Sequence, residues 1–528
     1  MAECAGIRAT AGVIIDPRVV VTGVTLDSRA IRPGDLYAAL PGAHVHGADF
    51  VAGAVDLGAV AVLTDPVGAA LLALDEVPVP VLVVPDPRAV LGGVGSLVYG
   101  RASEALTMLG ITGTNGKTTT AYLLDAALRA LGRVTGLIGT VETRIGEDRV
   151  KSVRTTPESP DLHALFAMML EHGVDTCTME VSSHALTLHR VDGVCFDVAA
   201  FTNLSQDHLD FHGSMESYYL AKASLFTPAR AVRGVVCVDD AWGQRLVRES
   251  GVPVVSVSSR EDVAADWQVQ SSGRGGSAFD LVGGGQRLSL RSALPGDFNR
   301  VNTAVAALVL LAAGYAADAI GPALAAGAHV PGRMERVLVG DVESAESVGV
   351  PVRSRMPLAI VDFAHTPDAV AAALKALRHN TSGSLIVVLG AGGDRDPGKR
   401  EAMGAAAAAY ADRVVVTDDN PRSEDPADIR AAVVKGAVAH ERSARRPPGR
   451  ILEIGDRSEA IQAAVAQSTA GDTVVVLGKG HESGQETAGV VHPFDDRAEL
   501  RAALIEHAAS IEHTAGHVVT DAKLGEAR

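Results

Sequence analysis

The sequence predicts an α/β protein of three domains: a small N-terminal α/β domain, a central phosphate-loop domain on a mostly parallel sheet, and a Rossmann-like C-terminal domain. The chain has 528 residues, the length of about three domains of ~150 residues each. Short Val- and Leu-rich runs alternate with Ala-rich helical stretches, which is typical of parallel sheets covered by helices. Within this pattern, one strand leads through a glycine-rich turn into a helix, and this order predicts a phosphate-binding loop.

The composition excludes several classes of protein. The formal charge is −16 and basic residues form no long block, which argues against a nucleic-acid-binding surface. Four cysteines lie far apart in the sequence, so we expect a reducing compartment and neither a disulfide framework nor a zinc site. The N-terminus lacks the build of a signal peptide, and no run reaches ~18 apolar residues. We therefore expect a cytoplasmic protein without a membrane span.

Residues 1–100 predict the small N-terminal domain. The expected strands are 19–24, 59–63 and 79–84, with one more that ends in turn residues at Gly42. His44 and His46 lie in the loop that follows, where a histidine is more often solvated than functional. Taken alone, this part of the chain carries no decisive chemistry.

The phosphate-binding loop covers residues 112–119, Thr-Gly-Thr-Asn-Gly-Lys-Thr-Thr. Its glycines would let backbone N–H groups turn inward around phosphate oxygens, and the N-terminus of the following helix adds a positive dipole end. Lys117 would reach the β- and γ-phosphates of a nucleotide, and Thr118 would offer its hydroxyl to Mg²⁺. Ile111 stands where the strict loop has its first glycine, so the sequence indicates a variant loop. A plain glycine-rich turn would not explain why a lysine and three threonines open the helix.

Further strands of the central domain also end in polar residues. The expected strands are 137–140, 175–180 and 196–201. Because ligands of doubly wound sheets collect at the carboxyl ends of strands, Glu180 is placed to bind Mg²⁺ beside the phosphates. The loop after the third strand contains His208. Lys222 is an isolated lysine on an otherwise apolar helix, the usual pattern of a surface lysine.

The last part of the chain predicts another α/β domain. The expected strands are 358–361, 385–389, 414–417 and 473–477. Each ends in a polar or glycine-rich loop, and four such loops at the carboxyl ends of parallel strands form one crevice. Residues 341–357, before the first of these strands, are expected to form a polar insertion. The tail after about residue 508 is expected to fray.

Nine sequence segments resemble those of the Mur ligases, and they occur in family order across nearly the whole chain. They are TGTNGKTT at 112–119, EVSSH at 180–184, TNLSQDHLDFHG at 202–213, GDFNRVN at 296–302, GRMER at 332–336, DFAHTPDA at 362–369, GGDRDPGKR at 392–400, DDNPRSEDP at 418–426 and GKGHE at 478–482. Within the family, the chain is similar to the enzymes that add the third amino acid of the peptidoglycan stem. The resemblance implies that residues 1–102 bind a UDP-sugar, residues 103–334 bind ATP, and residues 335–528 bind the incoming amino acid.

The resemblance also implies a reaction in two steps. ATP would phosphorylate the D-glutamyl γ-carboxylate of UDP-N-acetylmuramoyl-L-alanyl-D-glutamate. The amino group of the third residue would then attack the acyl-phosphate, giving a tetrahedral intermediate and then an amide, ADP and phosphate. Phosphoryl transfer depends mostly on positioning and on charge neutralisation, for which Mg²⁺ is the expected cofactor. The expected partners are ATP, this nucleotide substrate and diaminopimelate, without nucleic acid or membrane insertion, and the chain is expected to be a monomer.

The residues that match the family's motifs form the candidate site. The catalytic positions are Lys117, Glu180, His208 and Lys222. The ATP positions are Gly113, Thr114, Asn115, Gly116, Lys117, Thr118, Thr119, Asn302, Arg333 and Asp362. The metal positions are Thr118, Glu180, His208 for a second Mg²⁺, and Lys222 as a carbamate, whose negative charge suits a place near Mg²⁺. The positions for the UDP-sugar and dipeptide are Ser28, His44, Thr155, Thr156, Ser182 and Arg190. The diaminopimelate positions are Arg395, Asp419, Asn420, Arg422, Gly478 and Glu482.

The expected amino acid follows from the loop at 419–422, Asp-Asn-Pro-Arg. Family members that use diaminopimelate carry this sequence, and members that use lysine depart at its last position. Diaminopimelate has one carboxylate more than lysine, and Arg422 could hold it through two parallel hydrogen bonds. An arginine that merely ends a loop is the simpler interpretation. The chain departs from the family at Leu188, where some members have glutamine, and at Phe363, in place of the more usual tyrosine.

Three other interpretations compete with this one. A lysine-adding homologue would share most of the motifs. A ligase of the folylpolyglutamate synthase type would share the fold, but it would not need Asp27-Ser28-Arg29 or the loop at 419–422. A regulatory GTPase would need an Asn-Lys-x-Asp signature, and no lysine in this chain follows an asparagine. The sequence does not determine whether the meso or the LL isomer of diaminopimelate is used.

Overall fold

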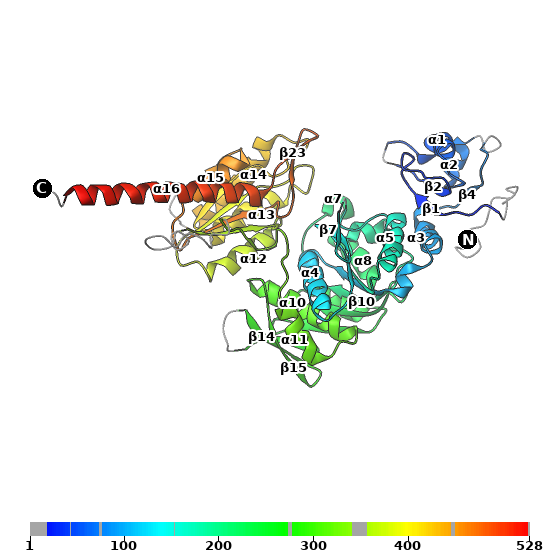
Figure 1. Cartoon of the computed structure of the whole chain (residues 1–528), viewed down its shortest axis with the longest axis horizontal. Helices are drawn as coiled ribbons and strands as arrows, with labels where there is room; N and C mark the ends of the chain where they lie inside the picture. The colour runs from blue at the N-terminus through cyan, green and yellow to red at the C-terminus, as the bar shows by residue number, and fades with distance from the viewer. Residues whose placement is uncertain are drawn as a thin grey trace. The chain divides into compact units, whose positions relative to one another are not determined.

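The computed structural model describes residues 18–42, 44–72, 77–152, 154–272, 277–339, 356–444 and 449–525 (Figure 1). The chain divides into two compact units. The first holds residues up to Leu204 together with 216–291 and 301–328, and the second holds 205–215, 292–300 and the chain from His329 onward. The expected domain boundaries at 102/103 and 334/335 stay predictions. The expected insertion at 341–357 lies outside the described residues, apart from Met356 and Pro357.

The first sheet is small and wholly parallel. Its strands, in sheet order, are β1 (Gly23–Thr25), β2 (Asp35–Ala39), β3 (Ala61–Thr64) and β4 (Val81–Val83). Alternate residues of β2 enter two cores, with Leu36 and Ala38 on one face and Tyr37 and Ala39 on the other. The helices of this part are α1 (Val51–Asp56), α2 (Pro66–Leu71) and α3 (Pro87–Val98), with a 3₁₀ turn η1 (Gly47–Phe50).

The second sheet carries the phosphate loop. Its order is β15 (Gln286–Arg291), β14 (Ala278–Gly283), β13 (Trp267–Ser271), β12 (Val254–Ser258), β11 (Ala231–Cys237), β10 (Phe196–Phe201), β5 (Thr107–Thr112), β9 (Thr176–Glu180), β6 (Thr135–Ile138), β7 (Glu142–Ile145) and β8 (Asp148–Lys151). The strands from β13 to β6 run parallel, and antiparallel strands extend both edges. Because β5 lies between β10 and β9, Ile111 pairs with Glu180 and Thr112 with Phe201. The loops after these three strands therefore start at one level of one edge.

Helices connect the strands of this sheet, as the alternating pattern predicts. They are α4 (Lys117–Ala130), α5 (Ser159–Glu171), α6 (Ser183–Thr187), α7 (Leu209–His212), α8 (Met215–Ala223) and α9 (Ala241–Glu249), with the 3₁₀ turn η4 (Ser224–Phe226). The 3₁₀ turn η3 (Ala102–Ala105) precedes the first strand, and α10 (Asp297–Ala312) and α11 (Ala317–Ala325) follow the last. The first residue of α4 is Lys117, so the phosphate loop ends directly at a helix N-terminus.

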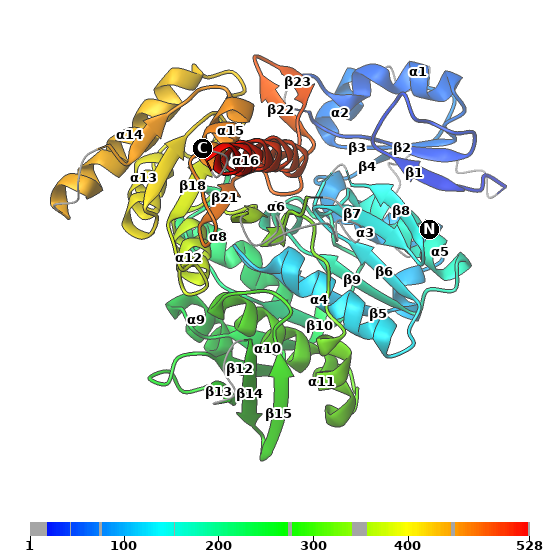
Figure 2. The same ribbon diagram turned by 60° about the vertical axis from the view of Figure 1, so that its left-hand side comes forward.

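The sheet of the second unit is also mostly parallel. Its order is β16 (Glu335–Arg336), β17 (Leu358–Asp362), β21 (Thr473–Leu477), β18 (Leu385–Leu389), β19 (Arg413–Val416) and β20 (Ile451–Glu453), and only β16 runs antiparallel to its neighbour. One face packs on α12 (Pro367–Arg378), α13 (Lys399–Tyr410) and α14 (Pro426–Ser443), and the other on α15 (Arg457–Ala466) and α16 (Asp496–Gly525), as Figure 2 shows. A hairpin of β22 (Gly484–Thr487) and β23 (Val490–Pro493) follows β21. Helices on both faces make this the expected Rossmann-like arrangement.

Two expectations about element ends were wrong. The strand expected at 19–24 begins only at Gly23, because Val19 and Val20 are 40% and 68% exposed and their apolar character does not mark a buried strand. The tail expected to fray after residue 508 continues α16 as far as Gly525, in agreement with the helix propensity of its Ala and Glu residues. No helix in the described part of the chain has the length and apolarity needed to cross a membrane.

A fully buried ion pair joins α15 and α16 on one face of the sheet of the second unit. Arg457, at the start of α15, pairs with Asp496, at the start of α16, with N–O distances of 2.7 and 2.8 Å. The same guanidinium donates to the carbonyl oxygens of Asp418 and Leu477, where β19 and β21 end. Arg457 thus stabilises the two loops of the candidate amino-acid site that follow β19 and β21.

We expect Asp496→Ala to destabilise the second unit by ~3–5 kcal/mol, because it leaves a buried guanidinium without its counter-charge. Thermal unfolding of the purified chain, compared with the unmodified protein, measures the loss. Glu401→Ala is the matched control, since Glu401 pairs with Lys435 on the surface and its loss should cost below ~1 kcal/mol. Equal melting temperatures of the Asp496→Ala and Glu401→Ala variants would contradict this account.

Candidate active site

The phosphate loop has glycines where its backbone requires them. Gly113 and Gly116 have φ values of +148° and +90°, which side chains disfavour. A Cβ atom on Gly113 would lie 1.9 Å from the hydroxyl of Thr202, and one on Gly116 would lie 2.5 Å from Oδ1 of Asn302. The predicted adenine-side residue Asn302 therefore lies directly against the loop.

Lys117 is folded over this loop. Its Nζ donates to the carbonyl oxygens of Gly113 and Thr114 at 3.0 and 2.9 Å. Asn203, in the loop after β10, supports the other side, because its carbonyl oxygen accepts from the N–H of Thr114 and its Oδ1 accepts from the N–H of Asn115. The loop is thus held in shape by its neighbours, with an ammonium group at its centre.

Glu180 is the last residue of β9 and is fully buried. Its Oε2 accepts from the hydroxyl of Thr118 at 2.9 Å and from that of Thr140 at 3.1 Å, and its Oε1 accepts from the N–H of Thr140 at 2.8 Å. The structure therefore brings Glu180 and Thr118 together, as the sequence predicts. A carboxylate and a hydroxyl are oxygen ligands of the type that Mg²⁺ prefers, so this pair fits the expected ion. Among the described residues, no group of three or more His, Cys, Asp or Glu side chains is arranged to hold a metal.

Lys222 is buried, so the interpretation as a surface lysine was wrong. The residue lies on α8 with 1% of its surface exposed. Its Nζ donates to the carbonyl oxygen of Gly113 at 2.8 Å and lies 4.7 Å from the ring centre of Tyr218. The apolar residues around it in the sequence did not show that the side chain turns inward to the phosphate loop.

His208 belongs to the second unit, whereas Lys117, Glu180 and Lys222 belong to the first. It precedes α7 with a φ of +54°, and its Nε2 lies 3.5 Å from Oδ2 of Asp207. Asp207 is also 3.7 Å from His365 and 3.5 Å from Lys399. Burial would raise the pKa of Asp207, but the hydrogen bond and charge of His365, with the charges of His208 and Lys399, lower it below its usual range. Asp207 therefore stays ionised and anchors the loop that carries His208.

Four of the six positions expected to bind the nucleotide substrate are connected. Thr156 donates to the carbonyl oxygen of Glu180 and accepts from the N–H of Ser182, and Arg190 donates to the carbonyl oxygen of Thr156. Thr155 lies within 3.1 Å of Thr140, which contacts Glu180. This loop is thus tied to the carboxylate of the expected metal site.

The remaining two positions lie in loops of the first sheet. Ser28 follows β1, and His44 is exposed in the loop after β2. The histidine with a defined structural contact is His46, whose Nε2 lies 3.1 Å from Asp65 and whose Nδ1 accepts from the N–H of Ala48.

Arg333 and Asp362 are neighbours in the second unit. Asp362 accepts from the N–H groups of Met334 and Ala364, and burial raises its pKa although Arg333 lowers it. The guanidinium of Arg333 lies 4.1 Å from the ring centre of Phe363. The ring face at 363, which phenylalanine shares with the more usual tyrosine, therefore packs on Arg333, a predicted ATP residue.

The six positions expected for diaminopimelate come from loops at the carboxyl edge of the sheet of the second unit. Asn420 donates to Glu482 at 2.9 Å, and a Cβ atom on Gly478 would lie 2.3 Å from Oδ2 of Asp419. Burial, and then the charge of Asp419, raise the pKa of Glu482. The fully buried Lys479 donates to Asn420 Oδ1 at 2.7 Å and orients its amide. Sequence reasoning missed Lys479, although it lies inside the GKGHE segment.

Arg422 and Arg395 border the same glycine. A Cβ atom on Gly392 would lie 3.1 Å from Nη1 of Arg422 and 3.8 Å from Cγ of Arg395. Arg422 itself has a φ of +53°, donates to the carbonyl oxygen of Gly393 at 2.6 Å and lies 3.4 Å from Glu486. Two guanidinium groups, an amide and two carboxylates thus line one edge, which suits an amino acid with charges of both signs.

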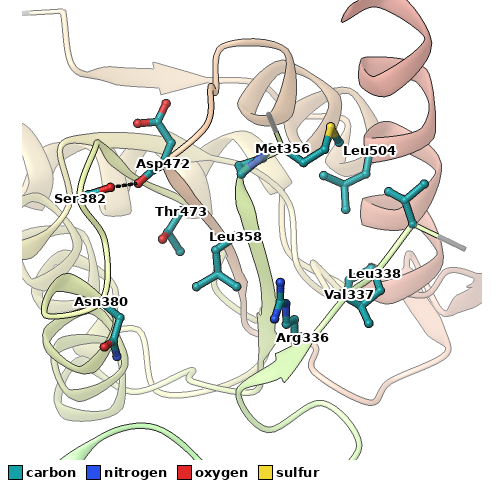
Figure 3. Close-up of a pocket in the computed structure, with 13 residues that line it drawn as sticks. Arg336, Val337, Leu338, Met356, Leu358, Asn380, Ser382, Asp472, Thr473 and Leu504 are labelled. Carbon is teal, nitrogen blue, oxygen red and sulfur yellow. Dashed lines mark hydrogen bonds between the residues drawn. The ribbon is translucent and has the colours of Figure 1, made fainter. Parts of the chain in front are cut away.

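A pocket of about 360 Å³ lies at the other end of this sheet (Figure 3). Its lining includes Leu358 and Thr473, the first residues of β17 and β21, and Leu504 of α16. The diaminopimelate positions follow the last residues of strands, so the pocket is separate from them.

Three family models match the chain. They are described as Mur ligase family, catalytic domain, at residues 20–99, Mur ligase middle domain at 111–310, and Mur ligase, glutamate ligase domain at 350–480. A Streptomyces avermitilis protein named UDP-N-acetylmuramoyl-L-alanyl-D-glutamate–2,6-diaminopimelate ligase is 54% identical over 490 residues, 92% of each chain. A solved structure with that name is 31% identical, covers 94% of this chain and 98% of its own, and has a TM-score of 0.63. A Mycobacterium tuberculosis folylpolyglutamate synthase, 20% identical, covers 73% of this chain and 91% of its own with a TM-score of 0.56, and this likeness shows the fold alone.

The fold, the phosphate loop and these matches define a class of enzyme, the ATP-dependent ligases. The chain belongs to the Mur ligase family. The resemblance seen in the nine sequence segments is thereby confirmed, and the interpretation as a regulatory GTPase is not favoured.

Proposed function

We propose that this protein joins diaminopimelate to the D-glutamyl γ-carboxylate of UDP-N-acetylmuramoyl-L-alanyl-D-glutamate, with conversion of ATP to ADP and phosphate. The observation that carries the proposal is that Arg395 and Arg422 both lie next to Gly392, close to Asn420, which donates to Glu482. Identity of 54% to a protein named for this reaction supports it. The cytoplasm as location and a monomeric state remain predictions.

The reaction would begin at the phosphate loop. Lys117 and the backbone N–H groups of residues 113–119 would hold the β- and γ-phosphates, and Asn302 would border the adenine side. Thr118 and Glu180 would hold Mg²⁺, which when bound supplies charge neutralisation between the γ-phosphate and the attacking carboxylate. Arg190 and the threonine pair at 155–156 would hold the dipeptide end that carries this carboxylate.

The amino acid would bind in the second unit. Arg395, Gly478 and Glu482 would hold the carboxylate and ammonium at the reacting end, while Arg422 would hold the distant carboxylate. Asp419 and Asn420 would fix these groups relative to one another. Arg333 and Asp362 would reach ATP, and His208 would serve a second Mg²⁺.

A phosphate-release assay with the purified chain, ATP, Mg²⁺ and UDP-N-acetylmuramoyl-L-alanyl-D-glutamate tests this function. Diaminopimelate isomers, lysine and glutamate are offered one at a time, and a parallel assay offers a folate substrate with glutamate in place of the UDP-linked dipeptide. Release that depends on diaminopimelate supports the proposal. Release that depends on lysine would identify a lysine-adding homologue, and release with a folate substrate and glutamate would identify a folylpolyglutamate synthase-type ligase.

We expect Lys222 to be a carbamate in the active protein, and Lys222→Ala to be nearly inactive. The structure places its Nζ 2.8 Å from the phosphate loop, where an anion would suit Mg²⁺ better than an ammonium group does. Labelling with ¹³C-bicarbonate and carbon NMR would detect the carbamate, and short added carboxylates should partly restore the alanine variant. Full activity with a bare ammonium in a high-resolution map would refute this expectation.

A further inference from the structure

Glu158 is surrounded by three arginines from different parts of the chain. Its Oε2 accepts from Arg88 at 3.0 Å, and its Oε1 lies 3.0 Å from Arg190 and 3.4 Å from Arg154. Glu158 directly precedes α5, yet its side chain does not cap that helix. Only 8% of its surface is exposed. The carboxylate therefore pairs with the three arginines and does not cap the helix that it precedes.

The two oxygens of Glu158 connect two different segments. Arg88 is the second residue of α3, a helix of the part of the chain that holds Ser28 and His44. Arg190 follows α6 and donates to the carbonyl oxygen of Thr156, which leads through Glu180 to the phosphate loop. A continuous chain of polar contacts thus runs from α3 to the phosphate loop, and Glu158 lies at its centre.

Close packing at a second point holds α3 in the same place. A Cβ atom on Gly92 of α3 would lie 2.1 Å from the carbonyl oxygen of Asp192, two residues after Arg190. The ion pair and this contact therefore fix α3 against the loop that carries Arg190.

The charges around Glu158 do not cancel. Three guanidinium groups meet the carboxylate of Glu158, and Asp161, whose pKa is raised by burial and by the charge of Glu158, adds a second carboxyl group close to Arg154, so positive charge is still in excess. Burial lowers the pKa of Arg190, and the nearby Arg154 and Arg88 lower it further, although Glu158 opposes them. Without Glu158, the three cations would repel one another, and the buried Arg190 would lose the group that orients it. An excess of positive charge suits a substrate with a diphosphate and two carboxylates.

We propose that Glu158 is a positioning residue for the nucleotide substrate, which holds Arg190 toward the 155–156 loop and fixes α3 against that loop through Arg88. The proposal deepens the proposed function and rests on it. Glu158 would act on binding of the UDP-linked dipeptide and leave the ATP site unchanged, because the contacts that connect it to the phosphate loop in the described part of the chain pass through Arg190, Thr156 and Glu180.

The test is a steady-state comparison of the full chain with Glu158→Gln. Glutamine keeps the size of the side chain but removes the charge that orients Arg190. We expect the KM for the UDP-linked dipeptide to rise about 10- to 100-fold, the cost of losing hydrogen bonds to charged groups. The kcat and the KM for ATP should stay within about 3-fold of the unmodified protein. Glu158→Asp, which keeps the charge, should recover part of the loss.

Two further variants separate positioning from loss of structure. Arg88→Ala removes only the α3 side of the pair, at a side chain that is 31% exposed, and should raise the same KM by a smaller factor with an unchanged melting temperature. Glu147→Gln is the matched control, because Glu147 pairs with Arg129 on the surface and should change nothing.

An unchanged or lower KM for the UDP-linked dipeptide in Glu158→Gln would overturn the proposal, since it would mean that the carboxylate only offsets positive charge. A parallel fall of kcat and rise of the ATP KM would overturn it too. If the unmodified chain releases no phosphate, the proposed function fails on its own. Calorimetry then compares the binding of the UDP-linked dipeptide to the unmodified and Glu158→Gln chains. Weaker binding to the variant supports the positioning role, and equal binding overturns it.

Discussion

Lys117→Ala and Glu180→Ala are each expected to lower phosphate release at least ~10²-fold, because each removes charge stabilisation at the transferring phosphoryl group. Lys117 provides the ammonium inside the phosphate loop, 3.0 Å from the carbonyl oxygen of Gly113. Glu180 provides the buried carboxylate, 2.9 Å from the hydroxyl of Thr118. The assay is phosphate release at saturating ATP, nucleotide substrate and diaminopimelate.

A loss of folding must be separated from a loss of chemistry at Glu180. Its two oxygens accept three hydrogen bonds in a fully buried position, so alanine would leave Thr118 and Thr140 without their acceptor. Glu180→Gln retains one acceptor oxygen and the side-chain volume and should melt close to the unmodified protein while it stays inactive. Lys435→Ala and Glu147→Ala, both at exposed ion pairs, should keep full activity. Near-normal release from Lys117→Ala or from Glu180→Gln would show that the phosphate loop is not the site of phosphoryl transfer.

The strands that could be predicted were those with strong local signals. The run at 196–201 is a strand with those limits, and Glu180 ends its strand as expected, because buried parallel strands are continuous apolar runs that stop at polar residues. The start of β1 could not be predicted, since exposed valines resemble buried ones in a sequence. The order of strands in the sheet that carries the phosphate loop also depends on pairings between segments far apart in the sequence, and no local sequence pattern indicates which strands pair.

Candidate site residues could be predicted where they belong to a short sequence motif. They could not be predicted where their position depends on whether a charged side chain is buried. The short motifs of the loops identified Thr118, Glu180 and Asn420, and the structure places each among the expected neighbours. The burial of Lys222 and the fully buried pair of Arg457 and Asp496 were not visible, because a charged residue in a sequence is by default a surface residue. Only the fold brings their partners close enough to make burial of the charge tolerable.

The unmodified protein is expected to prefer diaminopimelate over lysine by up to ~10⁴-fold in kcat/KM, and Arg422→Ala to lose this preference. Diaminopimelate would pair its distant carboxylate with the guanidinium of Arg422. Lysine would leave that guanidinium without a substrate carboxylate and with Glu486, 3.4 Å away, as its counter-charge, and the loss of the charged hydrogen bonds to the substrate sets the discrimination. Initial rates of phosphate release with each amino acid in turn give the two kcat/KM values for each protein.

The simpler interpretation, in which Arg422 only braces its loop, predicts a different result. In the structure Arg422 does contact the loop, through the carbonyl oxygen of Gly393 and the carboxylate of Glu486. Glu486→Gln weakens this bracing while the guanidinium stays in place, so it should keep the preference for diaminopimelate. Arg422→Lys keeps a positive charge without the two parallel donors and should retain only part of the preference. If Glu486→Gln loses the preference as fully as Arg422→Ala, or if the unmodified protein uses lysine and diaminopimelate with comparable kcat/KM, Arg422 does not select the amino acid.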